Sequence, residues 1–178
     1  METFSQEVRP VNFIREGVKI GLINGAIALL LMYGGYFAGL DAFVTVQFIS
    51  KFIPYMMVIL IIYGLQLSKR NGGYLAFKEG LQYSFMSYVV VALLVAIGTY
   101  ILFNLVDKNL TEKSFDLSIE RLNKMGMKEE EIERAIGKRE DQNTGGARIF
   151  LGTGFGLIWD FVLSLIVTII IRREKPAF

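Results

Sequence analysis

The chain contains no cysteine and no histidine among its 178 residues. It therefore has no disulfide, no thiol nucleophile, no imidazole acid–base group and none of the usual ligands for zinc, iron–sulfur clusters or histidine-bound haem. We expect no enzyme activity, and neither a metal nor a cofactor. The net charge of +2 is also too small to indicate binding to nucleic acid.

Charge is scarce in four long stretches of the chain. They are Ile20–Leu40 (21 residues), Phe52–Ser68 (17 residues, preceded by the uncharged Ala42–Ser50), Leu81–Val106 (26 residues) and Ile149–Ile171 (23 residues, with Asp160 as its one charge). A helix rises about 1.5 Å per residue, so about 20 apolar residues cross the roughly 30 Å hydrocarbon layer. The mean hydropathy of +0.45 agrees. We predict an integral membrane protein with four spanning helices.

The predicted fold is all-α: a four-helix transmembrane bundle with an extramembrane amphipathic helical hairpin between the third and fourth helices. The helices are expected at about 17–38, 44–67, 80–106 and 149–171, in a single membrane domain over residues 17–178, with the hairpin at 107–148. Residues 1–16 are interpreted as a cytoplasmic tail. A signal peptide fits poorly, because these mixed polar residues precede an apolar run that is too long and no small-residue cleavage motif follows.

Proline and glycine predict where the helices bend and stop. Pro54 predicts a kink inside the second helix, because a helix that began there and ended at Leu67 would be only about 21 Å long. Gly39 and the pair Gly72-Gly73 predict turns between spans. Gly126 predicts the end of the first hairpin helix.

The segment 107–148 holds ten acidic and nine basic residues. Its apolar residues recur at helical spacing before and after Gly126, which predicts two amphipathic helices. One interpretation is a cap folded over the bundle, and the other is a module that binds a partner. We favour the cap, because each apolar stripe is narrow and needs a surface to cover.

Basic residues predict the orientation. With both termini inside, the inner segments 1–19, 68–80 and 172–178 hold nine Lys and Arg in 39 residues, and the outer segments 39–51 and 107–148 hold ten in 55. Lys69-Arg70 and Arg172-Arg173 lie directly at helix ends. We therefore expect cytoplasmic termini and an outer hairpin.

Several weak motifs occur in a specific order. Gly-Gly-Tyr-x-x-Phe-x-x-Gly-Leu (Gly72–Leu81) leads into the third helix, Lys-Met-Gly-Met-x-Glu-Glu-Glu-Ile-Glu (Lys124–Glu133) lies in the hairpin, and Arg-Arg-Glu-Lys-Pro-x-Phe (Arg172–Phe178) ends the chain. Over nearly its whole length the chain resembles the bacterial membrane family catalogued as domain of unknown function 4199. The resemblance implies four helices in a bacterial inner membrane, and it implies no activity and no site residues. Lys128 lies where a small capping residue is expected, so the second hairpin helix is predicted to start loosely.

Three of the predicted spans carry small or polar residues every four positions. The rows are Gly17, Gly21 and Gly25; Gly80, Ser84, Tyr88, Ala92 and Ala96; and Gly152, Gly156, Asp160, Ser164 and Thr168. Such rows let helix backbones approach closely and let hydroxyl groups bond across helices. Packing is the favoured interpretation, and a polar cavity is the alternative.

Asp160 lies at mid-membrane on the last of these rows. A carboxylate there costs roughly 2.5–3.5 kcal/mol on insertion scales, so it should face the bundle and either find a donor or stay protonated. By depth, Asn24, Ser87 and Tyr88 are the nearest candidates. We favour a structural bond between helices over an ion or substrate path.

Two functions remain open from the sequence. The first is a non-catalytic scaffold or accessory subunit that meets the lipid bilayer and a membrane-protein partner or a second copy of itself. The second is a small transporter or channel component that uses Asp160. The candidate functional or packing residues are Asp160, Asn24, Gly152, Gly156 and Ser164.

Overall fold

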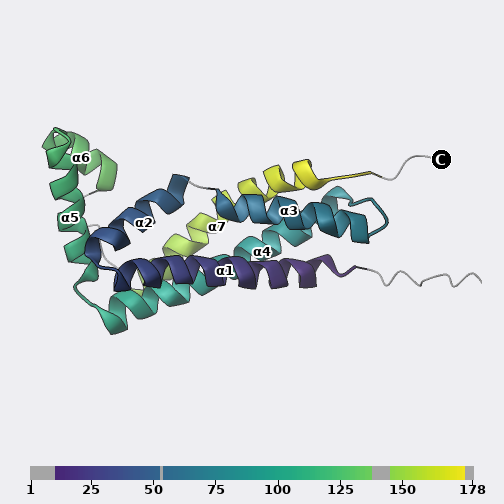
Figure 1. Ribbon diagram of the computed structural model, residues 1–178, viewed down its shortest axis with the longest axis horizontal. Helices are drawn as coiled ribbons and strands as arrows, with labels where there is room; N and C mark the ends of the chain where they lie inside the picture. Colours follow the sequence, from purple (N-terminus) through teal and green to yellow (C-terminus); the bar gives the residue numbers. More distant parts are fainter. Residues whose placement is uncertain (1–10, 53, 138–144, 175–178) are drawn as a thin grey trace, which may run out of the picture. The chain divides into compact units, whose positions relative to one another are not determined.

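A computed structural model describes residues 11–52, 54–137 and 145–174, with side chains of 51 and 52 excepted. Its elements are α1 (Phe13–Phe37), α2 (Leu40–Phe52), α3 (Tyr55–Arg70), α4 (Phe77–Tyr100), the π-helix η1 (Ile101–Val106), α5 (Leu110–Lys124), α6 (Glu129–Ile136) and α7 (Gly146–Ile171) (Figure 1). The all-α prediction is confirmed. Most of the expected tail, residues 138–144 of the expected hairpin and the last four residues lie outside the described residues.

The spans follow the hydropathy of the sequence. Three helical stretches are long and apolar enough to cross a membrane: α1, α4 continued by η1, and α7. The pair α2 and α3 is the fourth when it is counted as one broken span. The protein is therefore an integral membrane protein with three to four spanning segments.

The prediction of a kinked second helix that begins near residue 44 was wrong in detail. Helix α2 begins at Leu40, directly after Gly39, and α3 begins only at Tyr55. Gly39 has a φ of +114°, which glycine adopts without strain, so only two residues, Ala38 and Gly39, separate α1 from α2. Pro54 lies in the break itself, because proline lacks the N–H for a helical hydrogen bond and restricts the residue before it.

The hairpin forms as predicted up to its last loop. Helix α5 ends at Lys124 and Gly126 follows with a φ of +81°. The expected loose start of α6 is not seen: the Glu131 carboxylate accepts the backbone N–H of Lys128 at 3.0 Å. This glutamate satisfies a free donor at the helix start and replaces the missing capping side chain.

The apolar faces of the hairpin are partly buried. Helix α5 packs against both α2 and α6 (Figure 1), with Leu110, Phe115 and Ile132 all at most 9% exposed. On the polar side, Arg121 lies 2.6 Å from the carboxylate of Asp41. These contacts agree with a cap over α2, and the partner-binding alternative stays a prediction.

Contacts gather in two compact units, and α1, α4 and α7 contribute to both. Unit 1 comprises residues 1–24, 55–90 and 157–178, and unit 2 comprises residues 25–54 and 91–156. The core of unit 1 is the cluster Phe13, Ile20, Leu60, Leu67, Leu75, Tyr83, Tyr88, Val167 and Ile171. The core of unit 2 is the cluster Met32, Phe43, Leu102 and Leu110.

Three segments that are far apart in the sequence meet in unit 1. Arg70, at the end of α3, lies 3.7 Å from the carboxylate of Glu16 at the start of α1. Leu75 exchanges backbone hydrogen bonds with Arg173, just beyond α7. The start of α1, the α3–α4 connection and the end of α7 thus meet. These contacts agree with four alternating spans, in which these three segments lie on the same side of the membrane.

Candidate functional site

The glycine row of α1 lies directly on the backbone of α4. A Cβ atom on Gly21 would lie 2.8 Å from the Ser87 carbonyl oxygen, and one on Gly17 would clash with the Tyr83 carbonyl oxygen. Gly25 similarly contacts Leu94. Because these contacts advance in the same direction along both helices, α1 and α4 run parallel. The packing interpretation of this row is confirmed.

Beside this contact, two buried polar side chains have no partner. Asn24 and Ser87 are both 0% exposed. The amide nitrogen and oxygen of Asn24 and the hydroxyl of Ser87 form no hydrogen bond with the part of the chain that the structure describes. A buried amide or hydroxyl without a partner costs about 1–3 kcal/mol. The two groups, like the buried and unpartnered hydroxyl of Ser68 in the same unit, therefore lower the stability of unit 1.

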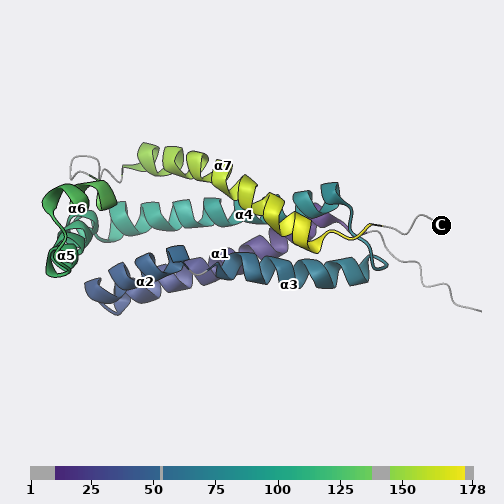
Figure 2. The same ribbon diagram turned by 90° about the horizontal axis from the view of Figure 1, so that it is seen from above.

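In unit 1 the last part of α7 lies beside α4 (Figure 2), and a polar contact joins the two helices there. The Ser84 hydroxyl lies 3.0 Å from Thr168 Oγ1 and 3.1 Å from the Ser164 carbonyl oxygen. The Ser164 hydroxyl turns back and donates to the Phe161 carbonyl at 2.7 Å. Ser164 thus contributes its backbone oxygen to the helix contact. The two rows meet here, and the helices run antiparallel, because Gly80 faces Thr168 while Phe85 faces Phe161.

Asp160 lies one turn before Ser164 and is half-buried. The adjacent Phe161 ring meets Phe85 edge-on, with ring centroids 5.4 Å apart. Among the residues that the structure describes, Asp160 has no hydrogen bond or ion pair. None of the three candidate donors Asn24, Ser87 and Tyr88 is therefore bonded to it, and the expected bond between helices is not seen in the described chain.

Gly152 and Gly156 lie in unit 2 and are exposed. A Cβ atom on either would meet nothing within 4 Å in the described chain. Their large neighbours Phe155 and Trp159 are also exposed, at 74% and 65%. This end of the α7 row is therefore open, whereas Ser164 and Thr168 at the other end are buried.

Sequence reasoning missed a charged cluster at the start of α1. Glu16, placed in the tail by hydropathy, is only 6% exposed. Its carboxylate accepts the Tyr63 hydroxyl at 2.6 Å and the Lys19 ammonium at 2.7 Å, with Arg70 at 3.7 Å. The Glu16–Lys19 spacing of three residues on one helix face was an available signal.

The polar groups described above are hydroxyl, amide and carboxylate groups, which can form hydrogen bonds. Across residues 11–52, 54–137 and 145–174, no three acidic side chains lie together as metal ligands. Among the described residues, Asp160 is not paired with a second carboxylate or a base. Hydroxyl, amide and carboxylate groups in a membrane interior can hold helices together or line a polar path.

The profile of the family described as "Protein of unknown function (DUF4199)" matches residues 19–173. The chain belongs to this family. The match covers the hairpin and all of the spans except the first six residues of α1, and it confirms the resemblance seen in the motifs. The family description assigns no activity. Comparison with curated proteins and comparison with solved structures each find no match.

Proposed function

We propose that this protein is a non-catalytic membrane scaffold or accessory subunit, and that the open glycine face of α7 is where a partner helix packs. Gly152 and Gly156 lie four residues apart and so share one face of the helix. Each glycine disfavours a helix by about 0.8–1.0 kcal/mol relative to alanine. Inside the described chain nothing packs on them in return, and small residues four apart are typical of close helix–helix contacts in membranes.

The open face carries this proposal. The same spacing in Gly17 and Gly21 is filled by α4, so the chain itself shows what such a row accommodates: another backbone. The partner is a second membrane protein or a second copy of this chain. We place the protein in a bacterial inner membrane with both termini cytoplasmic, on the family resemblance and the basic residues at the helix ends.

The test compares Gly156→Leu with Gly154→Leu. Both positions are exposed and open, but Gly154 lies on another face of α7, so it is a matched control. Full-length protein is purified from native membranes in mild detergent, and co-purifying proteins and oligomeric state are measured. We expect Gly156→Leu to lose the partner or the oligomer, and Gly154→Leu to keep it. Equal retention by both variants would contradict the proposal.

A second candidate is supported by the unpaired polar groups of unit 1. Asn24, Ser87 and Asp160 all lie in this unit, and none has a hydrogen-bond partner within the described residues. Such groups in a membrane protein are typical of ion or substrate paths. The alternative function is a transporter or channel component in which Asp160 carries the charge. Flux into liposomes that contain only the purified protein would support it over the scaffold.

A further inference from the structure

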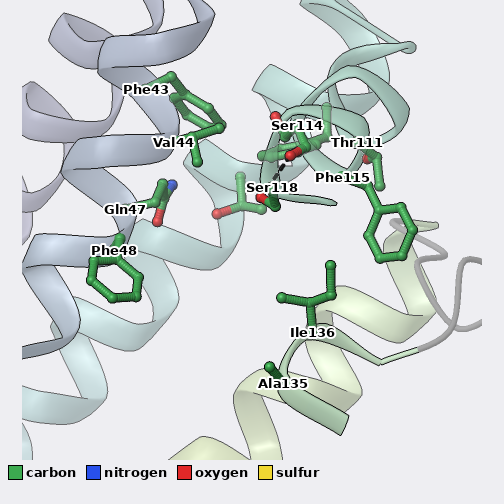
Figure 3. A pocket seen from close by; sticks show the side chains of 12 residues that line it. Phe43, Val44, Gln47, Phe48, Thr111, Ser114, Phe115, Ser118, Ala135 and Ile136 are labelled. Atoms are coloured by element: carbon green, nitrogen blue, oxygen red, sulfur yellow. Dashed lines mark hydrogen bonds between the residues drawn. The ribbon is translucent and has the colours of Figure 1, made fainter. Parts of the chain in front are cut away.

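Unit 2 contains a cavity of about 530 Å³ beneath the hairpin. Figure 3 shows side chains of α2 on one side of it and side chains of α5 and α6 on the other. Residues of α4 and η1 complete the lining. The volume lies within the roughly 300–1,000 Å³ of typical small-molecule sites.

The lining is mostly apolar and carries no formal charge. Five large side chains contribute to it: Phe43, Phe48, Phe103, Phe115 and Ile136. Two cations of α5 are paired, since Arg121 bonds to Asp41 at 2.6 Å and Lys113 to Asp107 at 3.0 Å. An anionic ligand would therefore enter without a free counter-charge in the lining and would lose its hydration at high cost.

A few polar groups are placed among these apolar side chains. The Ser114 hydroxyl is buried and has no hydrogen-bond partner among the described residues. The Ser118 hydroxyl donates to the Ser114 carbonyl at 2.8 Å and keeps its acceptor capacity. Gln47 faces the cavity from α2 (Figure 3) and can both donate and accept. Buried polar groups without partners usually have an unseen one, so a ligand head group fits here.

The position of the cavity indicates where the ligand comes from. Thr99 and Phe103 belong to the spanning segment Phe77–Val106, and Phe43, Val44 and Phe48 belong to α2, the first half of the broken span. The cavity thus lies between membrane-spanning helices and the amphipathic hairpin. Molecules dissolved in the bilayer can reach it more readily than solutes in water.

We propose that this cavity binds a neutral amphiphile from the bilayer: an alkyl chain against the aromatic side chains, and an uncharged hydroxyl head group at Ser114 and Gln47. The proposal is independent of the partner helix proposed for α7. It adds a ligand site in unit 2 to a protein with no assigned ligand.

The test uses a photoactivatable sixteen-carbon alcohol with full-length protein in lipid nanodiscs. We expect saturable labelling that mass spectrometry maps to the tryptic peptide Ser114–Arg121. Unlabelled alcohol of the same length should compete, whereas the matching fatty acid, ionised at high pH, should compete at least tenfold less well. A six-carbon alcohol supplied from water should compete poorly. Equal competition by the ionised acid, or stronger competition by the short alcohol, would overturn the assigned chemistry or source.

Two variants connect the labelling to the cavity. Ala135→Phe, at an exposed position on the rim of the cavity, should narrow it and strongly reduce labelling, whereas Ala147→Phe, at an exposed position outside the lining, should not. Ser114→Ala keeps the fold and removes the unpaired hydroxyl, so apparent affinity should fall about three- to tenfold. Labelling that is not saturable, or that survives Ala135→Phe unchanged, would mean that the cavity holds water only and would overturn the proposal.

Discussion

The glycine rows of α1 and α7 have the same spacing but opposite surroundings. On α1, Gly17 and Gly21 press against backbone carbonyl groups of α4, and no side chain could be added without moving a helix. On α7, Gly152 and Gly156 are exposed and open. The same sequence pattern therefore serves packing inside the chain in one place and leaves a free face in the other. The pattern predicts a capacity for close approach, and the tertiary structure decides whether the chain itself uses it.

The two units differ in the same way, because unit 1 is closely packed and unit 2 has open surfaces. Unit 1 holds the filled glycine row, the Ser84–Thr168 contact and the buried Glu16. Unit 2 holds the cavity under the hairpin and the open α7 glycines. A well-packed region is expected to respond to substitutions through stability, and an open region through binding. The following predictions test this difference, from the largest expected effect to the smallest.

The largest expected effect is the presence or absence of thiol labelling. It tests on which side of the membrane the α3–α4 connection of unit 1 and the hairpin of unit 2 lie. The chain has no native cysteine, so single cysteines can be introduced without background. We expect Ala76→Cys, in the exposed α3–α4 connection, to be protected from an impermeant thiol reagent in intact cells. Met125→Cys, at a hairpin residue that is 75% exposed, should be labelled. The reverse pattern would invert the orientation, and labelling of both would refute the four-span arrangement.

The next effect is a loss of stability in the filled row. Gly21→Leu must push α1 away from the Ser87 backbone, which cannot yield like a side chain, so we expect a cost of about 3 kcal/mol, near the upper end for overpacking. Gly34→Leu is the matched control, because Gly34 is an exposed glycine of the same helix with nothing within 4 Å. Thermal unfolding in detergent measures both. Equal melting temperatures for the two variants would refute the close α1–α4 contact.

A smaller effect is expected at the charged cluster of unit 1. Glu16→Ala removes the acceptor of the Tyr63 hydroxyl, and we expect it to cost about 1 kcal/mol. Lys19 and Arg70 are about half exposed, so their ion pairs should add little. In a double-mutant cycle with Tyr63→Phe, the two losses should be clearly less than additive. Additive losses would mean that the hydrogen bond contributes nothing.

The smallest expected effect on stability is that of Asp160→Asn. An amide resembles a protonated carboxyl group in shape, and hydrogen bonds between helices in membranes average about 0.6 kcal/mol. We therefore expect an almost unchanged melting temperature in detergent. The phenotype in cells is the discriminating measurement: full function would end the ion-path hypothesis, and lost function with intact stability would end the purely structural one.

The approximate positions of the helices follow from the sequence because they depend on the hydropathy and the glycines of each local stretch. Long uncharged runs predict spans, since moving apolar surface out of water dominates their free energy, and Gly39 and Gly126 end helices through local backbone geometry. The hairpin was predicted for the same reason, from its helical spacing. The break at Pro54 was only half predicted, because the proline shows that a helix is disturbed but not whether it bends or ends.

The candidate site was predicted only in its parts. The sequence identified the rows that contain Ser84, Ser164 and Asp160, but not that Gly152 and Gly156 would be left open. It missed the burial of Glu16, whose partner Tyr63 is 47 residues away. Transfer free energies are sums over single residues, so the sequence alone determined that this is a membrane protein and where its helices lie. Contacts between helices depend on register and distance across the fold. Only the tertiary structure therefore decided which polar groups are paired, which glycines are covered and where a cavity remains.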